Sequence, residues 1–279
     1  MDQLIAVVTG SSSGFGLETC LEFASRGYLV IATMRDTEKR TRLMELATKQ
    51  GLDGYLDIQP LDVTDGSSIM AWSHYMNRIG RIDVLVNNAG YAGAGFVEEI
   101  PLDEYRNQFE TNVFGVIAVT QVVLPFMREA GKGKIINLSS ISGRIAFPGL
   151  SPYIASKHAL EGWSESLRLE MKPFGVDVAN VEPGSFQTGI WSTGKQITEK
   201  SLQTDSPYYE TMQKIEKYIK DGEPKYEDPH LVARLIADIA EKENPTFRHP
   251  IGKGVRIGIA LKNSIPWKYW ERMFFSKMK

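Results

Sequence analysis

The 279-residue sequence is poor in cysteine and has no long hydrophobic run. Its single cysteine, Cys20, excludes an intramolecular disulfide and is typical of a reducing compartment. The apolar stretch at the N-terminus, LIAVV, is too short for the hydrophobic region of a signal peptide, and no other run has the length of a membrane span. We therefore expect a cytoplasmic protein that does not cross a membrane, with Cys20 as a small core residue.

The sequence also has no excess of positive charge, and its histidines are not spaced like the ligands of a metal ion. The net charge of -2 and the pI near 6.2 give no sign of a basic surface, so no nucleic-acid partner is expected. The four histidines, His74, His158, His230 and His249, lack ligand spacing, and no metal site is expected. A hydrophobic content of 42% suffices for the core of one large domain, which we place at residues 1–279.

Strand and helix patterns alternate along most of the chain. This alternation predicts a Rossmann-like, doubly wound α/β fold, in which helices cover both faces of a parallel sheet. The ligand crevice of such a sheet lies at the carboxyl ends of its strands. Strand patterns lie at 4–9, 28–34, 55–63, 82–90, 134–139, 176–183 and 246–251, and helical patterns lie at 37–50, 66–80, 102–129, 152–173 and 228–242, among others.

The first strand runs into a glycine-rich loop, GSSSGFG, and then into a helical pattern. Gly10, Gly14 and Gly16 allow the backbone to approach a diphosphate at a helix N-terminus, where N–H groups and the helix dipole favour an anion. Their spacing, G-x-x-x-G-x-G, differs from the commoner G-x-G-x-x-G fingerprint. A dinucleotide site and a simple glycine-rich turn therefore both remain open for this loop.

The residues after the second strand bear on the choice of cofactor. An acidic residue there binds the ribose 2′-hydroxyl of NAD, whereas an arginine accommodates the 2′-phosphate of NADP. Met34 stands at the expected position of the acid and Arg35 follows it, which favours NADP(H) over NAD(H). Lys39 and Arg40 add positive charge one turn later. Asp36 is the counter-argument, because a strand that ends one residue later would make it the ribose ligand; a solvated, charged helix start is a third interpretation.

The stretch from Lys134 to Lys157 carries three reactive side chains. In a helix, Tyr153 and Lys157 project from one face one turn apart, so that a cation stands beside the phenol. A free tyrosine has a pKa of about 10, and a neighbouring ammonium lowers it by favouring the phenolate. Ser140, at the end of the preceding strand, is placed to hydrogen-bond the same substrate oxygen. This set predicts a general acid/base for a carbonyl or alcohol, although an ordinary amphipathic helix has the same Tyr-x-x-x-Lys spacing.

Three asparagines have more than one interpretation. Asn87 and Asn88 end the fourth strand, where they are explained by cross-links between loops, by cofactor contacts or by a simple turn. Asn112 lies in the middle of a predicted helix, where asparagine is unfavourable, which indicates either a function or an exposed position.

Two C-terminal segments depart from the alternation. We interpret residues 185–225 as a substrate lid, helical between 207 and 221, with a packed surface hairpin as the alternative. The extension at 252–279 combines aromatic and basic residues in KNSIPWKYWERMFFSKMK. Peripheral contact with a membrane surface is one interpretation of it; packing on the domain, covering the substrate mouth and joining a dimer interface are the others. The lid residues that indicate an apolar substrate are Phe186, Ile190, Trp191, Tyr208, Tyr209 and Met212.

Taken together, these residues resemble the single-domain short-chain dehydrogenases/reductases over nearly the whole chain. The stretches ATMRD and VEPGSFQTGI are most similar to the hydroxysteroid and retinol dehydrogenase branch, in which an arginine at the Arg35 position accompanies NADP(H). The resemblance implies a sheet of about seven strands and a homodimer or homotetramer. The shared motifs are Thr9-Gly10-x-x-x-Gly14-x-Gly16, Asp62-Val63, Asn87-Asn88-Ala89-Gly90, Asn112, Ser140, Tyr153-x-x-x-Lys157, and Pro183-Gly184 with Thr188.

The resemblance also implies roles for the motif residues. Tyr153 would donate the proton to a carbonyl that Ser140 holds and polarises. Lys157 would lower the pKa of Tyr153 while it binds the nicotinamide ribose, and Asn112 would hold a water that links Lys157 to solvent. The implied cofactor contacts are Gly10, Ser12, Ser13, Gly14, Phe15, Gly16, Arg35, Asp62, Val63, Asn88, Ala89, Gly90, Tyr153, Lys157, Pro183, Gly184 and Thr188.

We therefore expect an NADP(H)-dependent oxidoreductase that transfers a hydride between nicotinamide and a carbonyl or secondary alcohol. The expected substrate is apolar and resembles a steroid, a retinoid or a ketone. The main alternative is an NADP(H)-binding regulatory or sensor protein without turnover, which would not need Ser140, Tyr153 and Lys157 together. An interaction protein that acts through its tail or lid is a further alternative, as is an epimerase or dehydratase of the longer, extended relatives. Fold and motifs do not name the substrate.

Overall fold

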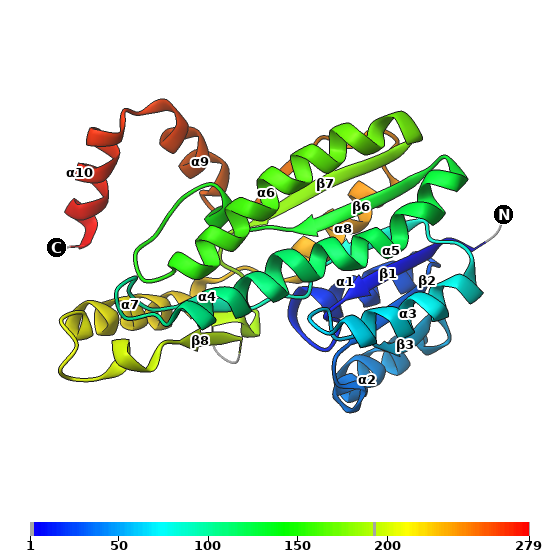
Figure 1. Ribbon diagram of the computed structural model, residues 1–279, viewed down its shortest axis with the longest axis horizontal. Helices are drawn as coiled ribbons and strands as arrows, with labels where there is room; N and C mark the ends of the chain where they lie inside the picture. The colour runs from blue at the N-terminus through cyan, green and yellow to red at the C-terminus, as the bar shows by residue number, and fades with distance from the viewer. Residues whose placement is uncertain (1–2, 192–193, 279) are drawn as a thin grey trace.

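The computed structural model describes residues 3–191 and 194–278. Ser192 and Thr193 of the predicted lid, and the last residue of the C-terminal extension, lie outside the described residues. The described chain is built around a seven-stranded parallel sheet with the strand order β3-β2-β1-β4-β6-β7-β9 (Figure 1). The Rossmann-like α/β fold predicted from the sequence is confirmed.

Most predicted strands and helices are present, with shifted ends. The third and fourth predicted strands are too long, because the chain leaves the sheet at Pro60 and Asn87. Strand β9 lies at the sheet edge, as its Pro250 requires. The strands of the main sheet are β1 (Ile5–Thr9), β2 (Leu29–Met34), β3 (Leu56–Pro60), β4 (Val84–Asn87), β6 (Gly133–Leu138), β7 (Val176–Pro183) and β9 (Arg248–Ile251); β5 (Ala92–Ala94) and β8 (Lys195–Ile197) form a second, parallel pair. The α-helices are α1 (Gly14–Ser25), α2 (Thr41–Gln50), α3 (Gly66–Ile79), α4 (Leu102–Phe109), α5 (Gly115–Ala130), α6 (Ser151–Met171), α7 (Tyr209–Gly222), α8 (His230–Glu241), α9 (Val255–Ser264) and α10 (Trp267–Met278).

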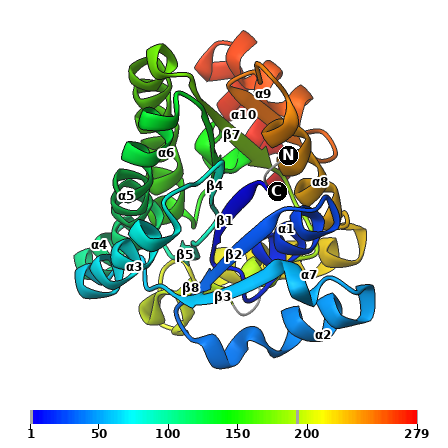
Figure 2. The same cartoon turned by 90° about the vertical axis from the view of Figure 1, so that its right-hand side faces the viewer.

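Helices cover both faces of the sheet (Figure 2), and the alternation of side chains along each strand divides the core into two layers. On β1, Ala6 and Val8 pack with α1, α2 and α8, whereas Val7 packs with α3, α5 and α6. Cys20 is fully buried in the first layer, and burial raises the pKa of its thiol to about 12. The expected place of Cys20 in the core is therefore confirmed.

The longest helical segment runs from α4 through one π-helical turn, Glu110–Phe114, into α5. The segment Leu102–Ala130 is long and apolar enough to cross a membrane by length and composition alone, two criteria that the core helix of a globular protein also meets. Val119, Val123 and Met127 are fully buried in the core layer beneath the sheet. The apolar composition of α5 is thus explained by its contact with the sheet.

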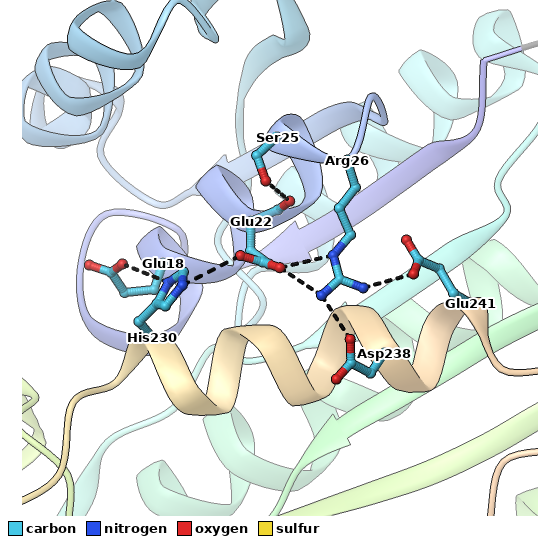
Figure 3. Close-up of polar contacts among 7 residues, drawn as sticks. All are labelled: Glu18, Glu22, Ser25, Arg26, His230, Asp238 and Glu241. Carbon is cyan, nitrogen blue, oxygen red and sulfur yellow. Dashed lines mark hydrogen bonds and ion pairs between the residues drawn. The ribbon is translucent and has the colours of Figure 1, made fainter.

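Helix α1, which follows the glycine loop, is tied to α8 by a charged network (Figure 3). The Arg26 guanidinium donates hydrogen bonds of 2.7 to 2.8 Å to Glu22 of its own helix and to Asp238 and Glu241 of α8. At the other end of the interface, His230 lies 3.7 Å from the Glu22 carboxylate. These contacts join α1, the helix that follows the glycine loop, to α8.

Candidate active site

A cavity of about 830 Å³ lies at the carboxyl ends of the parallel strands, where the fold predicts a ligand crevice. Nearly all the predicted site residues line it, although they come from segments far apart in sequence. Two predicted residues, Gly16 and Asn112, are not part of its lining and lie behind it. The predicted residues that line the cavity are Gly10, Ser12, Ser13, Gly14, Phe15, Arg35, Asp62, Val63, Asn88, Ala89, Gly90, Ser140, Tyr153, Lys157, Pro183, Gly184 and Thr188.

The loop between β1 and α1 has a backbone that only glycine adopts readily. Gly10 and Gly14 have φ angles of 67° and 55°, in the left-handed region. A Cβ atom on Gly16 would lie 2.4 Å from both the Asn88 amide nitrogen and the Gly10 carbonyl oxygen. Gly16 is therefore required for close packing under the loop, rather than at the cavity surface.

The two asparagines at the end of β4 have different roles. The Asn88 side chain donates hydrogen bonds of 2.8 and 3.0 Å to the carbonyls of Thr9 and Gly10, which joins the two loops. Asn87 is buried inside the sheet, where its amide donates to Thr120 and Asn137. The interpretation as a cross-link between loops is thus confirmed for Asn88, which also lines the cavity. Asn87 instead joins β4 to α5 and β6.

The glycine loop fits the diphosphate of a dinucleotide. A Cβ atom on Gly10 would lie 2.9 Å from the Ala89 Cα and 3.1 Å from the Asn88 amide nitrogen, so the loop after β4 approaches the Gly10 backbone closely. The loop leads directly into the N-terminus of α1, where free N–H groups and the helix dipole favour an anion. The backbone of Gly90 is closely packed as well, because a Cβ atom there would lie 3.0 Å from Asn112 Oδ1.

The end of the cavity beyond β2 is lined by Met34, Arg35, Asp36 and Lys39. The Asp36 carboxylate caps the following turn: it accepts a 3.1 Å hydrogen bond from the Glu38 N–H and lies 3.9 Å from the Lys39 ammonium. The Asp36 carboxylate therefore already has partners within its own turn. Arg35 contributes a positive charge to the cavity wall.

Ser140, Tyr153 and Lys157 converge on one part of the cavity, as their spacing predicts. Tyr153 and Lys157 project from the first two turns of α6, and the Lys157 Nζ lies 5.7 Å from the centre of the Tyr153 ring. Ser140 lies two residues after the end of β6, where its hydroxyl accepts a 3.1 Å hydrogen bond from the Ser142 N–H. The Lys157 ammonium donates a 2.6 Å hydrogen bond to the Leu138 carbonyl.

Burial dominates the electrostatics of this group. It raises the pKa of Tyr153 to about 12, while a hydrogen bond with the Ser140 side chain acts in the opposite direction. It lowers the pKa of Lys157 to about 8, against the favourable effect of the Glu161 carboxylate. Burial is thus the largest influence on the pKa of both groups. The lowering of the Tyr153 pKa by Lys157 stays a prediction.

Asn112 lies in the π-helical turn and is 1% exposed, which excludes an exposed position as the explanation of its place in a helix. Its side-chain oxygen accepts a 3.2 Å hydrogen bond from the Tyr91 N–H, and its amide donates to the Tyr91 carbonyl and the Ser156 hydroxyl. The Ser156 hydroxyl in turn donates to the Tyr153 carbonyl at 2.7 Å. Asn112 therefore joins the loop after β4 to the helix that carries Tyr153. Its role in holding a water stays a prediction.

The predicted lid residues divide between the cavity and the surrounding structure. Phe186 and Ile190 line the cavity, Tyr208 stacks on Phe96 with 4.3 Å between ring centres, and Met212 is buried. The Trp191 side chain lies outside the described part of the structure. The apolar residues described for this segment are therefore divided between the cavity wall and contacts elsewhere in the structure.

Some residues that line the cavity were not predicted from the sequence, among them Tyr91, Gly194 and Gln196. Gln196 belongs to β8, a strand of three residues that pairs with β5. A strand this short has no detectable periodicity, so only the pairing of two distant segments brings Gln196 to the site.

Comparison with known proteins gives a consistent family. The family model for short chain dehydrogenase matches residues 4–198. The chain is 47% identical to the uncharacterized oxidoreductase YusZ of Bacillus subtilis, over 100% of this chain and 99% of the relative. It is 35% identical to 3-ketodihydrosphingosine reductase of Bacteroides thetaiotaomicron, over 99% of both chains.

Solved structures agree with this result. A short-chain dehydrogenase from Streptomyces avermitilis is 34% identical and superposes with a TM-score of 0.82, over 99% of this chain and 98% of that one. ElxO, solved with NADP bound, is 27% identical with a TM-score of 0.75, over 92% of this chain and 100% of its own.

Proposed function

The chain belongs to the short-chain dehydrogenase family, and on this premise we propose that it is an NADP(H)-dependent oxidoreductase acting on a carbonyl or secondary alcohol of an apolar substrate. The observation that carries the proposal is the convergence of Ser140, Tyr153 and Lys157 on the cavity that the glycine loop also lines. A protein that only sensed the cofactor would have no need of these three side chains in one place.

The residues present fit a nicotinamide dinucleotide. The glycine loop and the N-terminus of α1 would hold the diphosphate, and Pro183, Gly184 and Thr188 would surround the nicotinamide end. When bound, the cofactor supplies or accepts the hydride. The protein supplies proton transfer and positioning.

Tyr153 is the proposed proton donor in the reducing direction. Its pKa of about 12 keeps the phenol protonated at neutral pH, so the hydroxyl is ready to give its proton to a carbonyl oxygen as negative charge develops there. Ser140 would stabilise the same oxygen by a hydrogen bond. The Lys157 ammonium would stabilise the phenolate that forms, because it is the buried cation nearest to the ring among the described residues.

The preference for NADP(H) rests on Arg35 and Lys39. Both line the end of the cavity beyond β2, where the 2′-phosphate of NADP would lie, and Asp36 is engaged by its own turn. NADP in the related ElxO structure agrees with this preference.

The proposed substrate is an apolar ketone. Tyr91, Phe186 and Ile190 give the cavity an apolar wall on the lid side. The name of the Bacteroides relative, a reductase of a 3-keto compound, favours reduction as the direction. The homodimer or homotetramer and the cytoplasmic location also stay predictions.

The test is a titration of the wild type and Tyr153→Phe with NADPH and NADH, followed by turnover of each on aldehydes, cyclic ketones, steroids and long-chain 3-ketones. We expect tighter binding of NADPH, turnover of at least one ketone, and a loss of about 10² to 10⁴-fold in turnover for Tyr153→Phe with NADPH binding retained. Binding without turnover on any substrate would favour the sensor. A Tyr153→Phe variant with a near-normal rate would overturn the mechanism.

A further inference from the structure

The two sides of helix α9 differ in their surroundings. Val255 and Ile259 are buried against Ile145 of the loop that follows β6. Ile257 and Leu261, on the opposite side, are 74% and 41% exposed. A surface helix of a globular protein normally turns polar residues outward, so this outer apolar side indicates contact with something other than water.

Helix α10 extends the same surface with aromatic residues. Trp267 and Tyr269 are 61% and 58% exposed, whereas Trp270 packs toward the Ile145 cluster. The Lys262 Nζ lies 4.5 Å from the centre of the Trp267 ring, so a cation and an indole share one part of the surface. Tryptophan, tyrosine and lysine with this exposure are typical of a membrane–water interface, where rings lie at the headgroup level and lysine stems reach toward charge.

The charge of the extension differs from that of the remaining chain. Residues 252–279 contain seven lysine and arginine residues and one acidic residue, a net charge of +6 in a chain with a total of -2. The exposed residues Lys268 and Arg272 belong to this set. A basic segment on an otherwise acidic protein is complementary to a surface of anionic lipids, and it is not explained by a general need for solubility.

The extension also packs against the wall of the cavity. Figure 1 shows α10 and the lid helix α7 at the same end of the molecule, beyond the carboxyl ends of the strands. Val255 packs so closely on Gly184, a cavity residue, that a Cβ atom there would lie 2.6 Å from its Cγ2. A surface that contacts α9 and α10 would therefore lie at the same end of the molecule as the cavity.

We propose that α9 and α10 form a docking surface for an anionic membrane. Ile257, Leu261, Trp267 and Tyr269 enter the interface, and the basic residues contact lipid headgroups, with the helices lying in the plane of the surface rather than across it. If the function proposed above holds, docking brings the cavity mouth to the bilayer, from which an apolar carbonyl substrate enters directly.

The test uses the full-length protein and unilamellar vesicles of pure phosphatidylcholine or of phosphatidylcholine mixed with phosphatidylglycerol. We expect the protein to sediment with the anionic vesicles, to sediment less with the neutral ones, and to dissociate as salt is raised. A Trp267→Ser/Tyr269→Ser variant should bind about tenfold more weakly. Leu169→Ser is the matched control, because Leu169 is 73% exposed on α6 but remote from the extension in sequence and fold, and it should bind like the wild type.

A second measurement keeps the test independent of folding. Tryptophan emission should shift to shorter wavelength on binding anionic vesicles, and Trp267→Phe should reduce that shift while binding persists. Absence of binding to anionic vesicles, equal binding to neutral ones, or unchanged binding by the double variant would overturn the proposal. Self-association without lipid that the double variant abolishes would assign the surface to a second copy of the chain and overturn it too. Since turnover is not a readout, these results do not depend on the proposed enzyme activity.

Discussion

The buried ammonium of Lys157 donates a 2.6 Å hydrogen bond to the main-chain carbonyl of Leu138. The bond joins α6 to the end of β6, two residues before Ser140, so that the helix and the strand present their reactive side chains to one cavity. Lys157 is only 6% exposed, and the protonation of its amine therefore depends on very few neighbouring charges.

Glu161 is the charge that opposes the effect of burial on Lys157, and its removal should shift the pH profile of the enzyme. The pKa of Lys157 is already lowered to about 8, and Glu161 acts to raise it. In Glu161→Gln this pKa should fall further, so the ammonium is lost at lower pH. We expect the alkaline fall of kcat/KM to begin about one pH unit lower than in the wild type, measured as a pH profile with saturating NADPH.

Glu165→Gln is the matched control for this measurement. Glu161 and Glu165 both accept hydrogen bonds from Arg248, at 3.0 and 2.8 Å, but only Glu161 acts on Lys157. In the control, the alkaline fall of kcat/KM should begin at the same pH as in the wild type. The same shift in both variants would show that Arg248, and not the charge of Glu161, determines the effect.

Arg35→Asp should weaken NADPH binding by about 10- to 100-fold and improve NADH binding, because a carboxylate replaces a cation at the expected place of the 2′-phosphate. The measurement is a fluorescence titration with both nucleotides. Arg40→Asp is a control of equal charge change one turn later in the chain, since Arg40 is not among the residues that line the cavity. Equal losses in the two variants would indicate a general charge effect, and unchanged NADPH affinity in Arg35→Asp would show that Arg35 is misplaced.

The parts of the site that could be predicted are those fixed by local spacing. Tyr153 and Lys157 are four residues apart in a helix. Ser140 follows one apolar strand and Pro183 ends another, so the parallel sheet brings both to one edge. The balance of desolvation and hydrogen bonds at Tyr153 could not be predicted, because it depends on how many atoms surround the phenol. Gln196 was missed for a related reason, since its place depends on the pairing of β8 with a strand about a hundred residues earlier.

The C-terminal helices were also beyond prediction from the sequence. Their apolar residues lie on both the inner and the outer sides, as Ile259 and Ile257 do, so no one-sided stripe marks the helices. The contacts between α1 and α8 could not be predicted either, because Arg26 and Asp238 are 212 residues apart in sequence. Nothing in the sequence around either residue distinguishes it from other charged surface residues.

Gly16→Ala should destabilise the fold by about 1 to 3 kcal/mol and weaken binding of both nucleotides, because its methyl group would overlap the Gly10 carbonyl and the Asn88 amide. Gly162→Ala is the contrasting change. Gly162 is an exposed residue within α6 with no atom within 4 Å of an added Cβ, so alanine should stabilise by about 0.5 to 1 kcal/mol. Urea unfolding curves of both variants measure the difference. A stable Gly16→Ala variant with normal nucleotide affinity would contradict the packing role of Gly16.

Arg26→Met should lower the free energy of unfolding by about 1 to 2 kcal/mol, more than the loss of one surface ion pair. The guanidinium side chain is 21% exposed and contacts three carboxylates, so the variant leaves like charges of α1 and α8 close together without a cation between them. Methionine retains much of the apolar stem, which limits the loss of packing. Thermal and urea unfolding at low salt measure the effect.

Arg106→Met provides the comparison, because Arg106 pairs with Asp103 and both side chains are well exposed, at 64% and 82%. It should change stability by less than about 0.5 kcal/mol. Added salt distinguishes the causes in Arg26→Met: repulsion among the remaining carboxylates is screened, so the difference from the wild type should shrink as ionic strength rises. A difference that does not change with salt would assign the loss to packing between α1 and α8 rather than to the charged network.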